Sequence, residues 1–336
     1  MIPSLTPIEG ARILVTGGAG FVGSCTVEEL IVHGAEEVIV IDDMVRGRPE
    51  NLSSALSTGR VRLIDGDICN SELVRTQLEG VDLVFHLAAL RITQCAAEPR
   101  RAMQVMVDAT YDLLDLCVAA GVGKVIMASS ASVYGMASSF PTGEAHPPYA
   151  NRTLYGAAKT FGEQLLRAFK EMYGLDYVAL RYFNAYGPRM DIHGRYTEVL
   201  IRWMERAEAG LAPVVFGDGS ETMDMVHVDD IARANLLAAV SPATDVALNV
   251  GSGTETSLAE LARRLAEAMG REDLVPIHEP PRAVNPVPKR LADLTLAREL
   301  IGYEPTIPLD KGLAQLVAWW RSERRGAPAS VPERAA

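Results

Sequence analysis

A short β-branched run that passes directly into a glycine-rich turn does most to constrain the fold of this chain. Residues 12–15 are followed by TGGAGFVGS, which places Gly17, Gly20 and Gly23 in a GxxGxxG spacing before a helical pattern. Glycines at these positions allow a tight turn, close approach of a pyrophosphate to backbone N–H groups, and close packing of the helix on the strand. The helix N-terminus adds a favourable field for the anion. This unit therefore predicts a dinucleotide-binding fold.

An acidic residue at the end of the next apolar run indicates which dinucleotide is bound. Asp42 lies 19 positions beyond Gly23, where a carboxylate can accept hydrogen bonds from the adenosine ribose hydroxyls. This carboxylate would repel the 2′-phosphate of NADP and favours NAD. Arg46 and Arg48 are a competing signal, because arginines shortly after this strand can bind that phosphate. We expect NAD.

The first half of the chain alternates short apolar runs with longer helical patterns. The runs cover residues 12–15, 38–41, 61–64, 83–87, 125–128 and 177–180. Near-continuous apolar strands that alternate with helices predict a parallel sheet covered on both faces. We therefore expect an α/β fold, a Rossmann-type doubly wound parallel sheet.

After about Pro188 the pattern changes to shorter strands and frequent proline and glycine. Strands are expected at Val214–Phe216 and 247–250, and helices at 229–240 and 257–269. We expect an NAD-binding domain over residues 1–188, joined by parts of 226–250. A smaller α/β substrate-binding lobe would cover 189–325, and 326–336 would be a tail.

Composition argues against several partners. The net charge of −11, without a block of like charge, disfavours binding to nucleic acid. No apolar segment is long enough to span a bilayer, and the N-terminus does not resemble a signal peptide. The four cysteines are scattered without metal-ligand spacing, so we expect reduced thiols in a cytoplasmic protein and no metal site.

Residues 153–164 read TLYGAAKTFGEQ within an amphipathic helical pattern for which Gly174 offers a stop. Residues four apart lie on one helix face, so Tyr155 and Lys159 should be neighbours. A tyrosine and a lysine at this spacing are common by chance, so the pair alone is weak evidence for a catalytic site.

Several further motifs occur in order along the chain: GDI at 66–68, HLAAL at 86–90, SSASVYG at 129–135, YGAAK at 155–159, LRYFNAYGPR at 180–189, FGDG at 216–219 and VHVDD at 226–230. Together with TGGAGFVG they resemble the extended short-chain dehydrogenase/reductase family, and within it the nucleotide-sugar epimerases. The resemblance covers roughly residues 10–320. It implies an NAD-dependent isomerase that acts on a nucleotide-diphosphate sugar, in most cases a UDP-sugar, and that forms homodimers.

The resemblance implies that Tyr155 is the catalytic base, Lys159 its partner, and Ser130 the hydroxyl that completes the triad. To act as a base near neutrality, a tyrosine must lose roughly three pKa units, about 4 kcal/mol. An ammonium at ~4 Å in a partly screened site can contribute about that much, and the nicotinamide charge would add to it. We expect the small residues between Tyr155 and Lys159 to leave room for cofactor and sugar.

The same resemblance assigns the remaining site residues. Expected cofactor contacts, besides Tyr155 and Lys159, are Gly17, Gly20, Phe21, Val22, Gly23, Asp42, Asp43, Asp67, Ile68, Leu87, Ala88, Ala89, Arg91, Tyr182 and Phe183. Expected substrate contacts, besides Ser130, are Asn184, Val199, Val214, Val215, Phe216, Arg282 and Arg290.

Residues beside the triad indicate which reaction is favoured. Dehydratases of this family carry acidic residues just before VYG, and decarboxylases carry a glutamate there, whereas this chain has Ala131 and Ser132. Without an acid in that place, elimination lacks its proton donor, so epimerisation is favoured. Two departures affect the site: Met106 stands where relatives carry an asparagine, and Met223 replaces an arginine that grips the diphosphate.

The family's pocket-size residue falls on Lys289 or Arg290, and counting back from Ala292 and Asp293 selects Arg290. A long cation there would disfavour an N-acetylated sugar and could pair with a sugar carboxylate. The expected reaction is therefore epimerisation at C4 of a UDP-hexose or UDP-hexuronate through a transient 4-keto intermediate. The alternatives are another epimerase or a reductase of the same family, or a relative that senses NAD without turnover.

Overall fold

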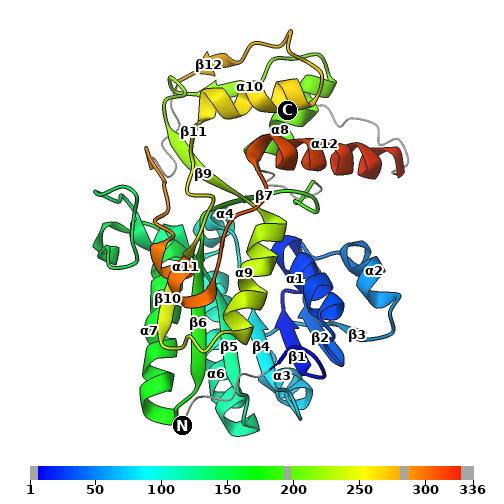
Figure 1. Cartoon of the computed structure of the whole chain (residues 1–336), viewed down its shortest axis with the longest axis vertical. Coiled ribbons are helices and arrows are strands. Elements are labelled where there is room, and N and C mark those ends of the chain that lie inside the picture. Colours follow the sequence, from blue (N-terminus) through cyan, green and yellow to red (C-terminus); the bar gives the residue numbers. More distant parts are fainter. Residues whose placement is uncertain (1–6, 193–197, 281–286, 327–336) are drawn as a thin grey trace.

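A seven-stranded parallel sheet organises the larger part of the molecule, and the predicted α/β fold with a doubly wound sheet is confirmed. The computed structural model describes residues 7–192, 198–280 and 287–326. The strand order is β10-β6-β5-β4-β1-β2-β3, with all pairs parallel (Figure 1). The strands are β1 (Arg12–Thr16), β2 (Glu37–Asp42), β3 (Val61–Asp65), β4 (Leu83–His86), β5 (Lys124–Ser130), β6 (Asp176–Tyr182) and β10 (Val246–Val250).

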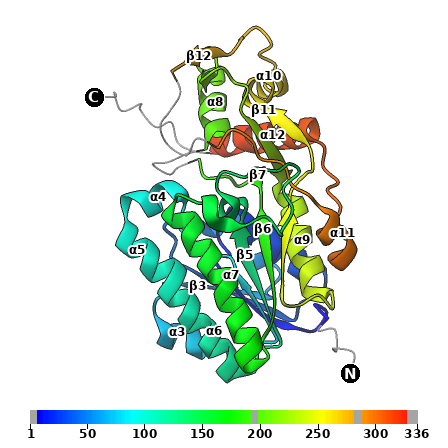
Figure 2. The same cartoon turned by 90° about the vertical axis from the view of Figure 1, so that its left-hand side faces the viewer.

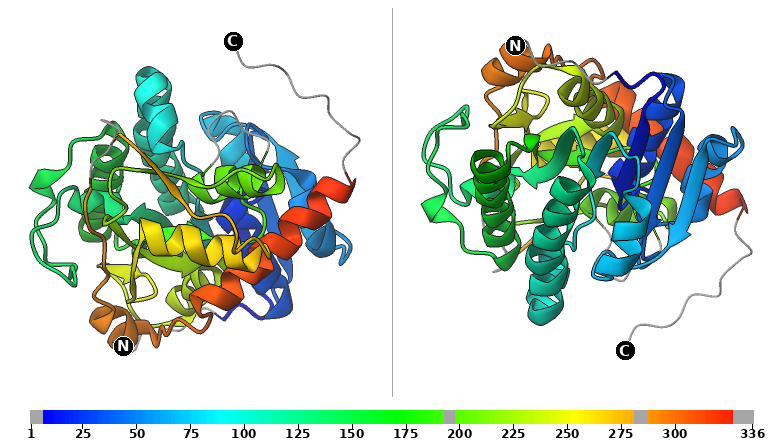
Figure 3. Two further views of the ribbon diagram at one scale, coloured as in Figure 1. Left: turned by 90° about the horizontal axis from the view of Figure 1, so that it is seen from above. Right: turned by 90° about the horizontal axis from the view of Figure 1, so that it is seen from below.

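Helices cover both faces of this sheet (Figures 2 and 3). On one face the apolar core is shared by α1 (Phe21–Val32), α2 (Ser53–Leu56), α9 (Val228–Val240) and α11 (Thr295–Ile301). On the other face it is shared by α3 (Ser71–Gln77), α4 (Ile92–Ala97), α5 (Pro99–Met103), α6 (Ala109–Ala120) and α7 (Leu154–Tyr173). Central strands are buried on both sides, which explains their continuous apolar runs.

Helix α7 is long because both of its ends are well defined. The Thr153 hydroxyl caps it by accepting a hydrogen bond from the Gly156 N–H at 3.1 Å. Gly174 ends it in the left-handed conformation at φ 74°, as its position in the sequence predicts. Tyr155 and Lys159 thus lie in the first two turns, at the end of the helix that approaches the carboxyl ends of the strands.

A smaller α/β lobe stands beyond the carboxyl ends of the large sheet (Figure 1). It contains one three-stranded sheet and one two-stranded sheet, packed around their own apolar core with three helices. Its elements are β7 (Asn184–Tyr186), β8 (Val214–Phe216), β9 (Thr222–His227), β11 (Glu255–Ser257), β12 (Ile277–Glu279), α8 (Val199–Glu208), α10 (Leu258–Ala268) and α12 (Leu309–Gly326).

The chain passes between these two regions more than once. After β9 it returns to the large sheet, where α9 packs on α1 and β10 pairs with β6 at the sheet edge. It returns again at α11, whose Ala297 and Ile301 belong to the core of the large sheet. Residues 226–250 are therefore split between the regions, while the domain boundaries themselves stay a prediction. Within the described residues, no helix is long and apolar enough to cross a membrane.

Candidate active site

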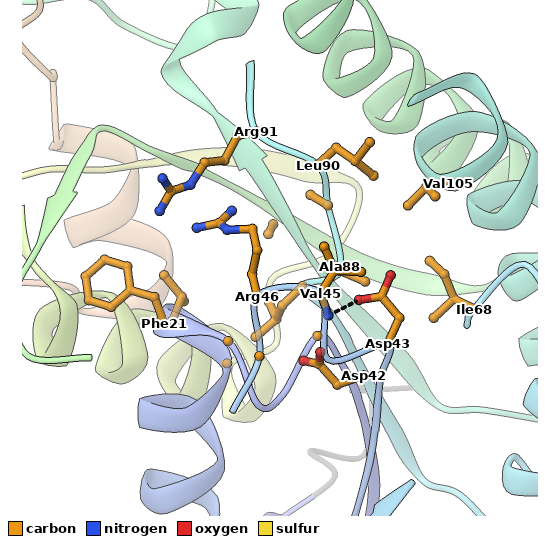
Figure 4. A pocket seen from close by; sticks show the side chains of 18 of the residues that line it. Phe21, Asp42, Asp43, Val45, Arg46, Ile68, Ala88, Leu90, Arg91 and Val105 are labelled. Carbon is orange, nitrogen blue, oxygen red and sulfur yellow. Dashed lines mark hydrogen bonds between the residues drawn. The ribbon is translucent and has the colours of Figure 1, made fainter. Parts of the chain in front are cut away.

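A cavity of about 480 Å³ lies where the carboxyl ends of the large sheet meet the smaller lobe. Strand ends β1, β2, β4, β5 and β6 and the start of α7 contribute to its wall, and Figure 4 shows the side chains around it. Ligands of open α/β sheets bind at this edge, where neighbouring strand connections leave in opposite directions. The position therefore fits a dinucleotide site.

The glycine-rich turn can adopt its conformation only with glycine at two positions. Gly17 has a φ of +71°, and a Cβ there would lie 2.7 Å from the Ala88 backbone nitrogen. A Cβ on Gly23 would lie 2.1 Å from the Gly17 carbonyl oxygen. No side chain caps the N-terminus of α1, whose first turn lines the cavity. Its backbone N–H groups are therefore suited to bind a pyrophosphate.

Asp42 is held rigidly at the end of β2. Its carboxylate accepts hydrogen bonds from the backbone N–H groups of Ala19 at 3.0 Å and Met44 at 3.1 Å. Burial raises the pKa of Asp42, and these hydrogen bonds oppose the rise. A carboxylate has about four acceptor positions, so it retains capacity for ribose hydroxyls. Asp43 beside it is exposed, and its side chain accepts from the Val45 N–H.

Arg46 and Arg48, the two arginines that could bind the 2′-phosphate of NADP, already pair with carboxylates of the protein. Arg46 Nε lies 3.4 Å from Asp191 Oδ2, and Arg48 pairs with Glu50 and Glu323. Figure 4 shows the guanidinium groups of Arg46 and Arg91 side by side within the cavity wall. Arg91 also lies 3.8 Å from Asp191, so one carboxylate bridges both cations. Neither Arg46 nor Arg48 is arranged as a dedicated 2′-phosphate site.

The three triad residues lie close together, and two of them, Tyr155 and Lys159, line the cavity. Lys159 is buried, and its Nζ donates to the Ala128 carbonyl at 2.6 Å. The same Nζ lies 5.8 Å from the centroid of the Tyr155 ring. Ser130 ends β5 beside Tyr155, and its hydroxyl oxygen also accepts from the Ser132 N–H at 3.1 Å. The arrangement can position a proton-transfer group against a ligand in the cavity.

The electrostatics of the pair differ from the sequence-based expectation. Burial raises the pKa of Tyr155, while the hydrogen bond with Ser130 and the positive charges of Arg290 and Arg46 lower it. Burial also lowers the pKa of Lys159 to about 8. In the polypeptide alone, desolvation therefore outweighs the interactions that lower the pKa of Tyr155, and its lowering by Lys159 together with NAD stays a prediction.

The small residues between Tyr155 and Lys159 do not leave space for ligands. A Cβ on Gly156 would lie 2.4 Å from the Asn151 amide and 2.6 Å from the Ser132 carbonyl oxygen. Ala158 is buried in the core, and Ala157 faces solvent. The expectation about their role is thus wrong: Gly156 allows the loop after β5 to pack against α7.

The structure brings nearly all expected cofactor contacts to one cavity. Phe183 is the exception, because its side chain is buried in the sheet core beside Tyr134. Their part in binding stays a prediction. The lining residues are Gly17, Gly20, Phe21, Val22, Gly23, Asp42, Asp43, Asp67, Ile68, Leu87, Ala88, Ala89, Arg91, Tyr155, Lys159 and Tyr182.

The expected substrate contacts are more scattered. Val215 is buried in the core of the smaller lobe, so its side chain cannot face a ligand, whereas Val214 and Phe216 are partly exposed. Val199 is exposed in the first turn of α8. The buried side-chain oxygen of Asn184 has no hydrogen-bond partner among the described residues. Arg282 lies outside the described residues.

The two candidates for the pocket-size residue differ in their surroundings. Lys289 turns outward, with its Nζ 2.5 Å from Glu255 and 5.2 Å from the Phe140 ring centroid. Arg290 lies on the other side of this extended segment, near enough for its charge to lower the pKa of Tyr155. Met223 packs against the core of the smaller lobe.

Sequence reasoning missed several cavity residues. Gln94, Glu98, Arg101, Val105 and Asp191 line the cavity but lie between the motifs, and Arg189 lines it as the last residue of LRYFNAYGPR without having been expected as a contact. The contact that Arg101 makes becomes visible only in the folded protein, where its guanidinium lies 2.6 Å from the Asp67 carboxylate. Among the described residues, no group of three His, Cys, Asp or Glu side chains is placed to hold a metal ion.

Comparison with known proteins agrees with this geometry. The profile of the NAD dependent epimerase/dehydratase family matches residues 13–251. The chain belongs to this family. The resemblance to the extended short-chain dehydrogenase/reductases is thereby confirmed, as are an enzyme of the epimerase type and NAD as its cofactor.

The chain is similar to several named members. The UDP-glucose 4-epimerase of Mycolicibacterium smegmatis is 38% identical over 93% of this chain and 99% of its own. The UDP-glucose 4-epimerase of Thermotoga maritima, solved with UDP-glucose, superposes with a TM-score of 0.86 at 36% identity over 93% and 99% of the two chains. The UDP-N-acetylglucosamine 4-epimerase of Methanobrevibacter ruminantium M1, in complex with UDP-N-acetylmuramic acid, gives a TM-score of 0.87 at 32% identity over 94% and 99%. The family members therefore differ in the sugar that they take.

Proposed function

We propose that this family member interconverts the C4 epimers of a UDP-hexose or UDP-hexuronate through a transient 4-keto sugar. The observation that carries the proposal is that Tyr155 and Lys159 line the same cavity as the glycine-rich turn, with Ser130 beside Tyr155. A base placed between a sugar and a nicotinamide is what such a reaction requires.

In this mechanism the protein moves one proton and holds two ligands. Tyr155 removes the proton of the C4 hydroxyl and later returns it, and Ser130 holds the phenol oxygen in place. Lys159 stabilises the ionised tyrosine by its charge. Bound NAD would supply reversible hydride transfer at C4, and its positive nicotinamide would lower the pKa of Tyr155, which burial raises.

The cavity residues fit NAD without needing other groups. The uncapped first turn of α1 would bind the pyrophosphate, Asp42 the adenosine ribose, and Lys159 the nicotinamide ribose. Asp42, rather than a free arginine, occupies the position that discriminates against a 2′-phosphate.

The segment after β5 supports epimerisation over elimination. Ala131 and Ser132 are buried in the turn over residues Ala131–Tyr134, directly beside Ser130. Neither side chain can donate a proton to a leaving hydroxyl as a carboxylic acid would. Arg290 near Tyr155 supports a non-acetylated sugar, because a long cation leaves less room for an N-acetyl group.

The proposal extends to assembly and location. The exposed apolar side chains Tyr111, Phe161, Met172 and Tyr173 on α6 and α7 are suited to a homodimer interface. The four cysteines are free, which suits a reducing compartment such as the cytoplasm.

The test is to incubate the purified protein with UDP-glucose, UDP-glucuronate, UDP-N-acetylglucosamine and GDP-, CDP- and TDP-sugars. Proton NMR should show a C4 epimer of a non-acetylated UDP-sugar, and mass spectrometry should show an unchanged mass. A product that has lost water or carbon dioxide would overturn the epimerase assignment. An N-acetylated sugar as best substrate would overturn the pocket-size argument.

A further inference from the structure

A buried ion pair lies beside the triad, and the lining residues of the cavity do not include either of its members. Glu163 follows Lys159 by four residues and Tyr155 by eight, so it lies on the same face of α7. Its side chain is 7% exposed and pairs with Arg181, which is 12% exposed, at the end of β6. A buried charge in this place affects every charge nearby, because screening by water is weak.

Glu163 uses both carboxylate oxygens. One accepts from the Ser129 hydroxyl and from Arg181 Nε at 2.9 Å, and the other accepts from Arg181 Nη2 at 2.6 Å. The remaining donors of Arg181 reach the Tyr134 hydroxyl at 2.9 Å and the Glu144 carbonyl at 3.0 Å. The pair is thus bidentate and embedded in a network that joins α7, β5 and β6.

The contact with Ser129 connects this pair to the active site. Ser129 and Ala128 both line the cavity, and the Ala128 carbonyl accepts from Lys159 Nζ. Glu163 therefore holds the strand end on which Lys159 is anchored. A hydrophobic replacement of a buried ion pair is often no less stable, so stability alone does not explain such a pair.

Few charged and titratable groups face Lys159 within the part of the chain that the structure describes. Burial lowers the pKa of His86 on β4 to about 3, so this imidazole is neutral. Burial raises the pKa of the Cys95 thiol on α4, and Tyr155 is the proposed base. On α7 the Glu163 carboxylate opposes the effect of burial on Lys159. Arg181 offsets part of this negative charge from β6.

We propose that Glu163 is a positioning residue for the reaction, which holds the end of β5 through Ser129 and, balanced by Arg181, sets the charge at Tyr155 and Lys159. This inference rests on the roles proposed above for those two residues. The negative charge of Glu163 favours a protonated Lys159. The positive charge of Arg181 offsets that negative charge, so that Glu163 does not keep Tyr155 protonated as well.

Opposite pH shifts in two single variants test the proposal. Glu163→Gln removes a negative charge, so the pKa values of Tyr155 and Lys159 both fall, and both limbs of the kcat/KM profile move about 0.5–1 pH unit to lower pH. Arg181→Met leaves the negative charge unbalanced, so both limbs move to higher pH by a similar amount. The double variant removes both charges and should return the profile close to that of the wild type.

A second readout does not require turnover. The phenolate absorbance of Tyr155 can be titrated in the holoenzyme without sugar, with a Tyr155→Phe variant of the same background subtracted. Its midpoint should shift in the same order: Glu163→Gln lowest, wild type and double variant between, Arg181→Met highest. A purely structural role would lower activity and melting temperature but would not order these midpoints by charge.

The outcomes separate the two proposals. If the wild type turns over no UDP-sugar, the proposed function fails, while the phenolate titration still decides this inference. Shifts in the same direction in both single variants, or no shift in either, overturn it. If Glu163→Gln does not fold, Arg181→Met can be compared with the double variant. These two proteins differ only at residue 163, so the difference between their pH profiles measures the effect of the Glu163 charge.

Discussion

The cofactor side and the sugar side of the cavity are built in different ways. The proposed cofactor side comes from the turns at the ends of β1, β2, β3 and β4, each of which directly follows a strand of the large sheet. The proposed sugar side depends on the end of β5, the start of α7 and the extended segment 287–293, which come from distant parts of the chain. Local motifs fix the first side, whereas long-range packing fixes the second.

This difference suggests which changes affect one side without the other. Substitutions in the turns of the large sheet should alter NAD binding and leave sugar preference unchanged. Substitutions of Tyr155 or Arg290 should alter turnover or sugar preference and leave NAD bound, whereas Lys159 belongs to both sides.

The largest expected effect is that of Tyr155→Phe, which removes the group proposed to transfer the proton. The turnover number should fall at least about a hundredfold, with NAD still bound, as measured by epimer formation and by NAD released on denaturation. Tyr182→Phe is a matched control. Tyr182 lines the same cavity, but its hydroxyl donates to Asn235 at 2.6 Å, so a loss of less than about tenfold is expected. Near-normal activity of Tyr155→Phe would contradict the mechanism.

The next effect concerns the cofactor side alone. Asp42→Asn should weaken NAD binding roughly ten- to fiftyfold, because a charged acceptor of the ribose hydroxyls becomes a neutral amide. Calorimetry on protein freed of NAD measures the dissociation constant. Asp43→Asn, one residue on and exposed, should change it less than about threefold. Equal effects of the two variants would show that Asp42 is not the ribose contact.

A smaller effect is expected on the sugar side. Arg290→Ser should change the ratio of kcat/KM values for UDP-glucose, UDP-glucuronate and UDP-N-acetylglucosamine by about three- to tenfold, in favour of the N-acetylated sugar. NAD binding should not change. Lys289→Ser is the control, since this side chain pairs with Glu255 away from Tyr155. No change of preference in Arg290→Ser would show that this residue does not line the sugar pocket.

The smallest effect is expected for Arg48→Ala. Arg48 is partly exposed and pairs with Glu50 and Glu323, so its loss should change NAD affinity by no more than about twofold. NADP should bind more weakly than NAD in both proteins. Tighter binding of NADP, lost in Arg48→Ala, would make this arginine a 2′-phosphate contact.

Much of the cofactor side could be predicted from the sequence. The strand–turn–helix pattern, Asp42 and the HLAAL motif each lie on one short segment, and the structure places them around the same cavity. Phe183 differs from the expectation because it lies between β6 and β7 with its side chain in the core, whereas Tyr182 at the end of β6 lines the cavity. Arg101 and Asp191 could not be anticipated, since each acts through a partner distant in sequence.

The sequence by itself determined the sheet, its cofactor edge and the helix that carries Tyr155 and Lys159, because apolar periodicity, glycine spacing and helix caps are local properties. Only the tertiary structure decided that Arg290 rather than Lys289 faces Tyr155, that Gly156 packs against a loop, and that Glu163 pairs with Arg181 behind the triad. It also decided that burial raises the pKa of Tyr155. The reason is that desolvation and charge pairing depend on which distant segments exclude water from a side chain, and chain order does not contain that information.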